Sequence, residues 1–246
     1  MIAVWFSCGA ASAVALKLTL KYHAAKHDVR AVNQLVKEEH PDNRRFLNDV
    51  AEWCGIKIEQ CPAPNVPTQS ARDVWEKRNF MVSPQGAPCT MLLKRQARQH
   101  WQNDNKPDWH VLGFTYDEQK RHERFILTET DRVIPVLIAR KVTKAMCYDY
   151  LRSEGIRIPA MYEYGFPNAN CIGCVKSASP TYWNMVRKHF PEVFDDRSEQ
   201  SRRLGVKLVN HKGKRIYLDE LPENAKGHDM KSMPECGLFC EERLEL

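Results

Sequence analysis

The sequence predicts an α/β fold in which a doubly wound, mainly parallel sheet is followed by an irregular, cysteine-bearing C-terminal region. Short apolar runs alternate with stretches of helical periodicity over residues 1–158, a pattern typical of a parallel sheet wrapped by helices. The alternation stops at Pro159. The chain has 246 residues, of which 43% are apolar and 28% charged, as in ordinary folded proteins with their own core. We therefore expect an α/β core over residues 1–158 and a C-terminal region over residues 159–246.

The core begins with an apolar strand at residues 2–7, a tight turn of small residues, and an Ala- and Leu-rich helix that continues to about Lys26. Gly55 suits the left-handed position that ends a helix, and Thr143 suits the position that begins one. Further strands are expected at residues 29–35, 56–58, 109–114 and 133–138. Further helices are expected at residues 42–54, 70–79, 88–102 and 143–155.

The C-terminal region contains a loop with Cys171 and Cys174, a helix near residues 180–190, and a hairpin at residues 206–218. A polar tail with Cys236 and Cys240 follows. The sequence shows no internal repeat and no low-complexity tract, so one core with an appended region accounts for the whole chain.

Charge and cysteine usage narrow the classes of function. The 37 Lys and Arg residues exceed the 31 Asp and Glu residues by six, which favours an anionic partner, although a solvated basic surface gives the same balance. No apolar run is long enough to span a membrane and no secretory signal is seen, so we expect a cytoplasmic protein without membrane association. Nine cysteines without such a signal favour thiolate chemistry or metal ligation over disulfides. Motifs of metalloproteases and serine hydrolases are absent.

The turn after the first strand is a candidate anion-binding loop. In a doubly wound sheet, ligands bind beyond the carboxyl ends of the strands, where helix N-termini present N–H groups and partial positive charge. Small residues let an anion approach the backbone, and serine hydroxyls can donate further hydrogen bonds. The loop residues are Ser7, Cys8, Gly9, Ala10, Ala11 and Ser12. The helix N-terminus would also lower the pKa of a thiol at Cys8, and the alternative is that Cys8 is a tolerated replacement of a glycine. A tight turn that binds nothing is the alternative.

The cysteines form two short-spaced pairs. Cys171 and Cys174 make a C-x-x-C in a glycine-containing loop, a spacing that fits zinc, an iron–sulfur cluster or a redox pair. Cys236 and Cys240 add a C-x-x-x-C. Four thiolates in two pairs favour a metal site over coincidence.

Several blocks resemble the phosphoadenylyl-sulfate (PAPS) and adenylyl-sulfate (APS) reductases of the adenine nucleotide α-hydrolase superfamily, which carry a PP-loop-like phosphate-binding loop. The letters S-C-G-A-A-S-A-V from Ser7 onward resemble the S-x-G core of these reductases. Glu39-His40-Pro41-Asp42-Asn43 stands in the place of their F-P-E-T segment, and residues 113–121 resemble their G-x-R-x-x-[DE]-S-x-x-R block. Residues 158–167 are similar to the segment before the C-x-x-C of cluster-bearing relatives, and E-C-G-L at residues 235–238 resembles their E-C-G-L-H motif.

The resemblance implies an adenine nucleotide α-hydrolase-like core that binds an adenine nucleotide or adenylyl sulfate and reduces it with a thioredoxin- or glutaredoxin-type donor. It implies that Cys236 attacks the sulfate sulfur, with a role as metal ligand as the alternative. Beyond the loop, the implied nucleotide- and anion-binding residues are Lys94, Gly113, Arg121 and Arg124. The alternative for Arg121 and Arg124 is that they are exposed arginines on an amphipathic helix. The implied cofactor is a [4Fe–4S] cluster, or zinc in its place, on Cys89, Cys171, Cys174 and Cys240. A homo-oligomer is compatible with these expectations.

Two other functions stay open. An ATP-dependent sulfurtransferase acting on nucleic acid, as in DNA phosphorothioation or tRNA thiolation, would use the same core and a cluster, and the basic surface favours it. Ala11 stands where ATP-cleaving relatives have aspartate, which counts against this function. A zinc-stabilised nucleic-acid-binding module without catalysis predicts a colourless protein whose binding to DNA or RNA depends on salt.

Overall fold

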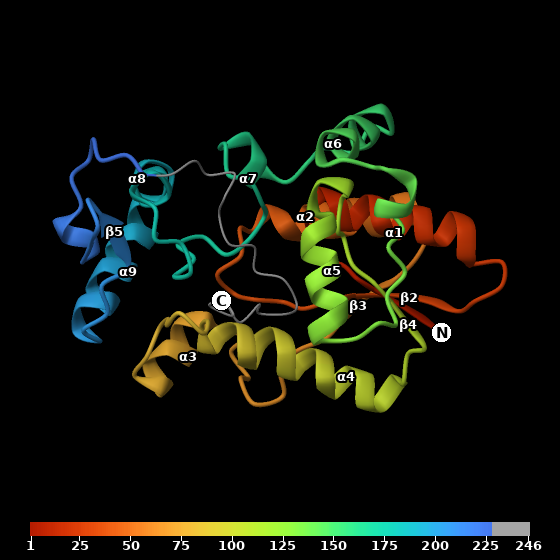
Figure 1. Cartoon of the computed structure of the whole chain (residues 1–246), viewed down its shortest axis with the longest axis horizontal. Coiled ribbons are helices and arrows are strands. Elements are labelled where there is room, and N and C mark those ends of the chain that lie inside the picture. Colours follow the sequence, from red (N-terminus) through yellow and green to blue (C-terminus); the bar gives the residue numbers. More distant parts are fainter. Residues whose placement is uncertain (228–246) are drawn as a thin grey trace.

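Four parallel strands form the sheet in the order β3-β2-β1-β4 (Figure 1). The structure is a computed structural model that describes residues 1–227. The strands are β1 (Ile2–Trp5), β2 (Val29–Asn33), β3 (Ile58–Gln60) and β4 (Trp109–Val111). The chain adds β2 and β3 on one side of β1 and then β4 on the other, so the strand order reverses between β1 and β4. Folds of this kind open a ligand crevice at the carboxyl ends of the two strands that flank such a reversal.

Helices cover both faces of the sheet, so the predicted α/β fold with a mainly parallel sheet is confirmed. In Figure 1, α1 (Ala10–His23) and α2 (Asp42–Cys54) lie above the strands and α4 (Ala97–Asn105) lies below them. The other elements of the core are α3 (Ala71–Arg78), the π-helix η1 (Thr90–Gln96), η2 (Tyr116–Glu118), α5 (Gln119–Thr128), η3 (Ile138–Arg140) and α6 (Lys144–Ser153).

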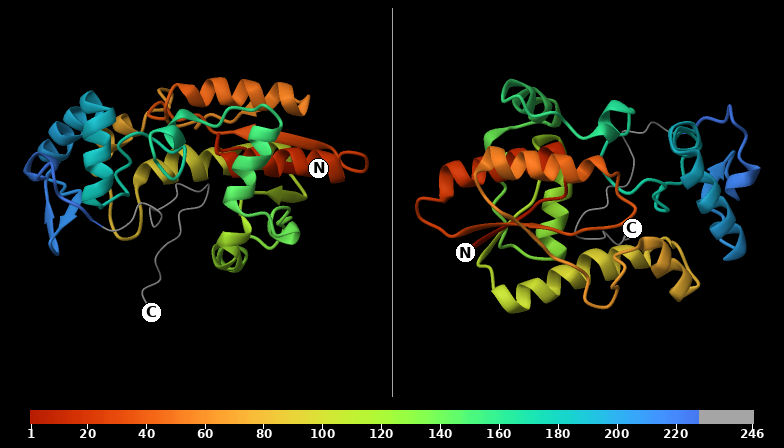
Figure 2. Two further views of the ribbon diagram at one scale, coloured as in Figure 1. Left: turned by 90° about the horizontal axis from the view of Figure 1, so that it is seen from above. Right: turned by 180° about the vertical axis from the view of Figure 1, so that it is seen from behind.

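The elements that follow the core extend to one side of the sheet (Figure 2). They are α7 (Ala160–Glu163), α8 (Pro180–His189), α9 (Pro191–Arg203), the antiparallel hairpin of β5 (Val209–His211) and β6 (Lys214–Ile216), and η4 (Leu218–Glu220). The helices α8 and α9 pack against each other, and the hairpin lies beside them (Figure 1). No helix within residues 1–227 combines the length and the apolar character needed to cross a membrane. The division at residue 158 stays a prediction.

Two apolar clusters hold the core together, one on each face of the sheet. Along β1, Ala3 and Trp5 belong to one cluster, whereas Ile2 and Val4 belong to the other. Successive side chains of a strand point to opposite faces. Both faces of β1 are therefore buried, as expected for the central strand of a parallel sheet covered by helices.

Local signals in the sequence placed most elements correctly. The helix predicted at residues 42–54 is α2, and Gly55 ends it with a φ of 64°. Thr143 caps α6, because its side chain accepts a hydrogen bond from the Met146 N–H. The strand predicted at residues 133–138 is wrong: only Val133 pairs with the sheet, through one bridge to His110, and the chain then turns into η3. Pro135 explains the difference, because proline has no N–H to donate to a strand ladder.

Ion pairs join α3 of the core to α9 of the C-terminal region. This contact was not predicted from the sequence. Arg72 Nε lies 2.9 Å from Asp196 Oδ1, and Arg203 Nη1 donates to Glu76 Oε2 at 2.6 Å. Gln200 Nε2 donates to Glu76 Oε1 at 2.7 Å. These contacts fix α9 to the core. No helix was expected from the sequence at α9, whereas α5 is the amphipathic helix that was considered for Arg121 and Arg124.

The Glu76 carboxylate predicts an acid-sensitive contribution to stability. Hydrogen bonds from Arg203 lower its pKa from the ordinary 4.5 to about 2. A carboxylate whose pKa falls on folding stabilises the native state above its unfolded pKa, and this stabilisation is lost as the pH drops from about 4.5 to about 2. We expect Glu76→Gln to lower the free energy of unfolding at pH 7 by about 1 kcal/mol or less, since the pair is partly exposed. Urea unfolding at pH 7 and pH 3 should show the difference between native and variant shrinking at pH 3; an unchanged difference would contradict this role.

Candidate active site

The end of β4 lies directly against the loop that follows β1. An ideal Cβ on Gly113 would lie 2.8 Å from the backbone nitrogen of Ser12 and 3.1 Å from the carbonyl carbon of Ala11. A side chain at this position would collide with backbone atoms, so only glycine allows the approach. Gly113 therefore sets how closely the loop and the end of β4 meet, at the reversal of strand order.

The loop turns sharply at Cys8, whose φ of 56° is in the left-handed region. The Cys8 side chain is buried, and Asn33 Nδ2 donates to its Sγ at 3.5 Å and to the Phe6 carbonyl at 2.8 Å. Burial raises the pKa of the Cys8 thiol above its ordinary value, and the nearby Glu39 carboxylate acts in the same direction. This direction is opposite to the lowering that was expected from the helix N-terminus, because burial disfavours the charged thiolate.

Side-chain hydroxyls hold two amides of the loop. The Ser7 N–H donates to Ser12 Oγ at 3.2 Å, and the Ala10 N–H donates to the Tyr162 hydroxyl at 3.3 Å. The Ser12 hydroxyl in turn donates to the Gly9 carbonyl at 2.8 Å. The first turn of α1 carries no acidic side chain, so its partial positive charge is not neutralised there.

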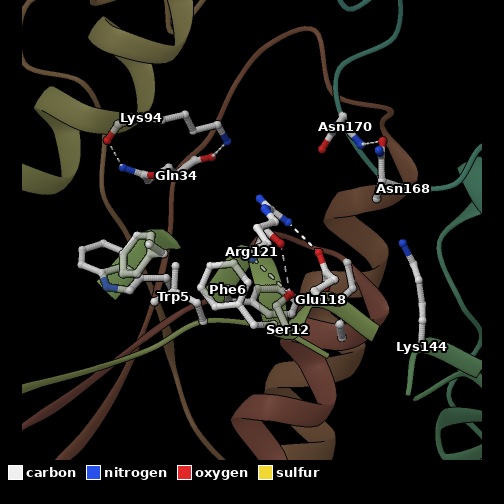
Figure 3. A pocket seen from close by; sticks show the side chains of 18 of the residues that line it. Trp5, Phe6, Ser12, Gln34, Lys94, Glu118, Arg121, Lys144, Asn168 and Asn170 are labelled. Atoms are coloured by element: carbon white, nitrogen blue, oxygen red, sulfur yellow. Dashed lines mark hydrogen bonds and ion pairs between the residues drawn. The ribbon is translucent and has the colours of Figure 1, made fainter. Parts of the chain in front are cut away.

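A pocket lies between this loop and the ends of β2 and β4 (Figure 3). The expected site residues that line it are Ser7, Gly9, Ala11, Ser12, Lys94, Gly113 and Arg121. Cys8 and Ala10 belong to the loop but not to the lining, and Arg124 lies on the exposed side of α5. Among the lining residues that were not predicted as site residues are Trp5, Gln34, Lys144, Asn168 and Asn170.

Lys94 lines the pocket from η1, the π-helix that interrupts the helix expected at residues 88–102. Its Nζ lies 3.0 Å from Glu39 Oε1 and donates to the Gln34 carbonyl at 3.0 Å. Both charged side chains are about nine-tenths buried, with exposed fractions of 10% for Lys94 and 8% for Glu39. A sulfate group bound by Lys94 would therefore have to share the ammonium group with the Glu39 carboxylate. π-Helical turns are frequent at functional sites.

Arg121 enters the pocket from α5 and is oriented by its neighbours. Its Nη1 donates to Glu118 Oε1 at 2.7 Å, and its guanidinium carbon lies 5.2 Å from the centre of the Phe114 ring. The other oxygen of Glu118 accepts from the N–H and the hydroxyl of Thr115, each at 3.2 Å. The carboxylate thus holds the guanidinium in a defined direction at the pocket wall.

Lys144, Asn168 and Asn170 line the side of the pocket that lies away from Lys94 (Figure 3). Lys144 Nζ donates to the Pro167 carbonyl at 2.7 Å. The Nδ2 atoms of Asn168 and Asn170 are buried and have no hydrogen-bond partner within residues 1–227. Asn43 Nδ2 donates to the Ala169 carbonyl at 3.1 Å and so attaches this segment to α2. Buried donors beside a cation favour a ligand rich in acceptor oxygens. Before the structure, only the position of these asparagines just after the reductase-like block at residues 158–167 could have drawn attention to them.

The C-x-x-C loop is anchored to the core and to α8. The N–H of Ile172, between the two cysteines, donates to the Glu38 carbonyl at 2.9 Å, and the N–H of Cys174 donates to the buried Tyr182 hydroxyl at 2.6 Å. Gly173 has a φ of 67°, and a Cβ there would lie 3.0 Å from Val193 Cγ1. These contacts hold the backbone of the loop between the two cysteines in place.

Three of the four expected metal ligands, Cys89, Cys171 and Cys174, lie within the described residues. Cys89 and Cys171 are partly buried against the apolar cluster that contains Cys174. Within residues 1–227, no three His, Cys, Asp or Glu side chains are grouped closely enough to hold a metal ion. Cys236 and Cys240 lie outside the described residues. The described cysteines therefore do not form a complete ligand set by themselves.

The fold and the pocket define an α/β protein with a parallel sheet. Its candidate site lies where the strand order reverses between β1 and β4, the switch point of the sheet. The sequence profile of the phosphoadenosine phosphosulfate reductase domain matches residues 1–180, and the chain belongs to this family. The structure is similar to the crystal structure of a PAPS reductase from Candida auris in a phosphate complex, with a TM-score of 0.52 and 12% sequence identity. That similarity covers 69% of this chain and 80% of the other, and it shows the shared fold. No curated protein sequence matches the chain.

Proposed function

We propose that this protein binds an adenylyl sulfate, APS or PAPS, in the pocket at the switch point and reduces it with a thiol donor. The observation that carries the proposal is the position of three basic side chains, Lys94, Arg121 and Lys144, around the N-terminal loop of α1. Helix N-termini bind phosphate and sulfate groups through their N–H groups and partial positive charge. Membership in the PAPS reductase domain family and the likeness to a reductase solved with phosphate support the same class of ligand.

The pocket residues would bind and orient the anionic part of the substrate. Arg121 presents a guanidinium that can bind a sulfate or phosphate in a bidentate manner, and Glu118 keeps it directed. Lys144 and the amides of Asn168 and Asn170 would bind oxygens at the opposite wall. The apolar residues Trp5, Phe6 and Phe114 would exclude water from the base and ribose.

Cys236 is the proposed nucleophile. Its thiolate would form a bond to the sulfate sulfur while the bond from that sulfur to the bridging phosphate oxygen breaks, and AMP or its 3′-phosphorylated form leaves. A thioredoxin- or glutaredoxin-type dithiol would then attack the Cys236 sulfur, so that sulfite leaves with the electron pair of the S–S bond. The second thiol of the donor resolves the mixed disulfide, which returns the Cys236 thiolate and leaves the donor oxidised.

We propose in addition that Cys89, Cys171, Cys174 and Cys240 hold a [4Fe–4S] cluster, with zinc as the alternative. The support is the anchored C-x-x-C loop and the spacing of the cysteines. Within residues 1–227, Cys89, Cys171 and Cys174 are not grouped closely enough to hold a metal ion, so the described geometry does not by itself support the cluster. When bound, an iron–sulfur cluster supplies a redox-active centre. No step of the proposed reaction passes through it.

Replacing Cys236 by serine tests the proposed reaction. The protein purified without oxygen should bind APS or PAPS in a calorimetric titration and release sulfite when a thioredoxin-type donor is present. We expect Cys236→Ser to keep the nucleotide affinity and the metal content while sulfite release falls by roughly a thousandfold or more, as when other catalytic nucleophiles are removed. Cys54→Ser, on α2, is the matched control and should release sulfite at the native rate.

The other outcomes would reassign the function. Binding of ATP with pyrophosphate release, and none of APS or PAPS, would support the sulfurtransferase. Stoichiometric zinc with salt-dependent nucleic-acid binding and no nucleotide affinity would support the binding module. Loss of metal from Cys236→Ser would make Cys236 a ligand and exclude the proposed nucleophile.

A further inference from the structure

Gln34 is a buried pocket residue with an unpaired hydrogen-bond acceptor. It follows the end of β2, lines the pocket and is 3% exposed. Its side-chain oxygen Oε1 is buried and has no hydrogen-bond partner within the described part of the chain, residues 1–227. Buried polar atoms are almost always hydrogen-bonded in native proteins, so an unpaired one beside a pocket needs a partner, which a ligand or a water molecule can supply.

The orientation of the Gln34 amide is fixed by the π-helix. Its Nε2 donates to the backbone carbonyl of Lys94, and Lys94 Nζ donates back to the Gln34 carbonyl at 3.0 Å. A carbonyl oxygen can only accept, so the atom facing it must be the amide nitrogen. The amide therefore cannot flip, and Gln34 presents an acceptor rather than a donor.

The neighbourhood of Gln34 suits a flat aromatic ring. Trp5 and Val32 lie opposite each other on β1 and β2, and both line the pocket, as do Leu112 and Phe114 after β4. In Figure 3, Gln34, Lys94 and Trp5 lie at one side of the pocket, whereas Asn168, Asn170 and Lys144 lie at the other. The pocket thus has one end with apolar walls, the buried Gln34 acceptor and the Lys94 ammonium paired with Glu39, and another end with Lys144 and the buried asparagine donors.

We propose that Gln34 selects the base of the nucleotide: its Oε1 accepts a hydrogen bond from the 6-amino group of adenine, while the phosphates and sulfate extend toward Asn168, Asn170 and Lys144. This inference rests on the proposed function and names the residue that sets its base specificity. A purine with a 6-oxo group would bring a second acceptor against Oε1. Sites built to hydrogen-bond a ligand group discriminate strongly against analogues that lack it, because their buried polar atoms are then left unpaired.

The test compares adenosine 5′-diphosphate (ADP) with inosine 5′-diphosphate (IDP), in which an oxo group replaces the 6-amino group. We expect the native protein to bind ADP between roughly 5-fold and 100-fold more tightly than IDP in calorimetric titrations, the range expected for one unpaired buried polar group. In Gln34→Met, which keeps the length of the side chain, the two affinities should agree within about threefold. Gln99→Met, on the exposed side of α4, is the matched control and should keep the native preference.

A second probe does not depend on the folding of a variant. N6,N6-dimethyl-ADP has no N–H at position 6, and the native protein should bind it more weakly than ADP by a factor similar to that for IDP. Equal binding of ADP and IDP by the native protein would overturn the role of Gln34, and so would an undiminished preference in a folded Gln34→Met protein. If neither ADP nor an adenylyl sulfate binds, the proposed function fails as well; if ADP binds without discrimination, only this inference fails.

Discussion

Replacing Gly113 by alanine is expected to abolish nucleotide binding and to lower the free energy of unfolding by about 1–3 kcal/mol, the usual cost of overpacking a buried site. The added methyl carbon would lie 2.8 Å from the Ser12 nitrogen and 3.1 Å from the Ser12 Cα. Both are backbone atoms, so no side chain can rotate to relieve the collision. The anion loop would have to move away from the end of β4. Titration with ADP and unfolding in urea measure the two effects.

The control for this substitution is Gly205→Ala, after α9. Gly205 has a φ of 68°, and a Cβ there would meet nothing within 4 Å. Alanine at Gly205 should cost about 1 kcal/mol of backbone strain and leave ADP binding unchanged. The comparison separates a loss of stability from a loss of binding. If Gly113→Ala binds ADP with native affinity, the close approach of β4 does not determine the shape of the loop.

Replacing Glu39 by alanine is expected to destabilise the fold by about 3–5 kcal/mol, the range for removing one partner of a buried ion pair. Glu39 lies 3.0 Å from Lys94 Nζ, and the two side chains are 8% and 10% exposed. Asn43 Nδ2 also donates to the Glu39 carboxylate, at 3.3 Å. The variant would remove the carboxylate that pairs with the buried Lys94 ammonium group and that accepts the hydrogen bond from Asn43 at the start of α2. Urea unfolding at neutral pH measures the loss.

Two further variants separate charge from packing at this pair. Glu39→Gln keeps the volume and one acceptor oxygen, so it should destabilise less than Glu39→Ala. The double variant Glu39→Met with Lys94→Met removes both charges and should recover most of the lost stability, since apolar residues often replace buried ion pairs at little cost. A loss below about 1 kcal/mol for Glu39→Ala, typical of an exposed pair, would show that the pair does not stabilise the pocket wall.

Elements that are set by neighbouring residues were predicted correctly, whereas elements that depend on distant contacts were not. The start and end of α2, the left-handed Gly55 and the Thr143 cap are set by residues within one helical turn, and all three were predicted correctly. The strand at residues 133–138 was predicted from its apolar character, but Pro135 breaks the ladder after a single bridge. The helix expected at residues 88–102 is present, yet its first part is the π-helix that carries Lys94.

In the candidate site, too, local patterns were recognised from the sequence and isolated side chains were not. The small-residue loop and Gly113 were found from the sequence because each has a recognisable pattern or matches a family block. Gln34, Asn168 and Asn170 were not predicted as site residues, because an isolated amide side chain has no periodicity and Gln34 stands where the family's D-T-G is lost. The position of Cys8 was known, but the direction of its pKa shift was not, since that shift depends on how many atoms of distant segments bury the thiol.

Patterns of neighbouring residues were enough to predict the alternating α/β order, the loop after the first strand and membership in the PAPS reductase domain family. The set of side chains that surround the pocket became visible only in the folded chain. The tertiary structure places Gln34 against the π-helix, Asn168 and Asn170 opposite it, and Gly113 against Ser12. Packing brings together groups that are far apart in the chain, and their burial and hydrogen bonds depend on that packing rather than on their neighbours in sequence.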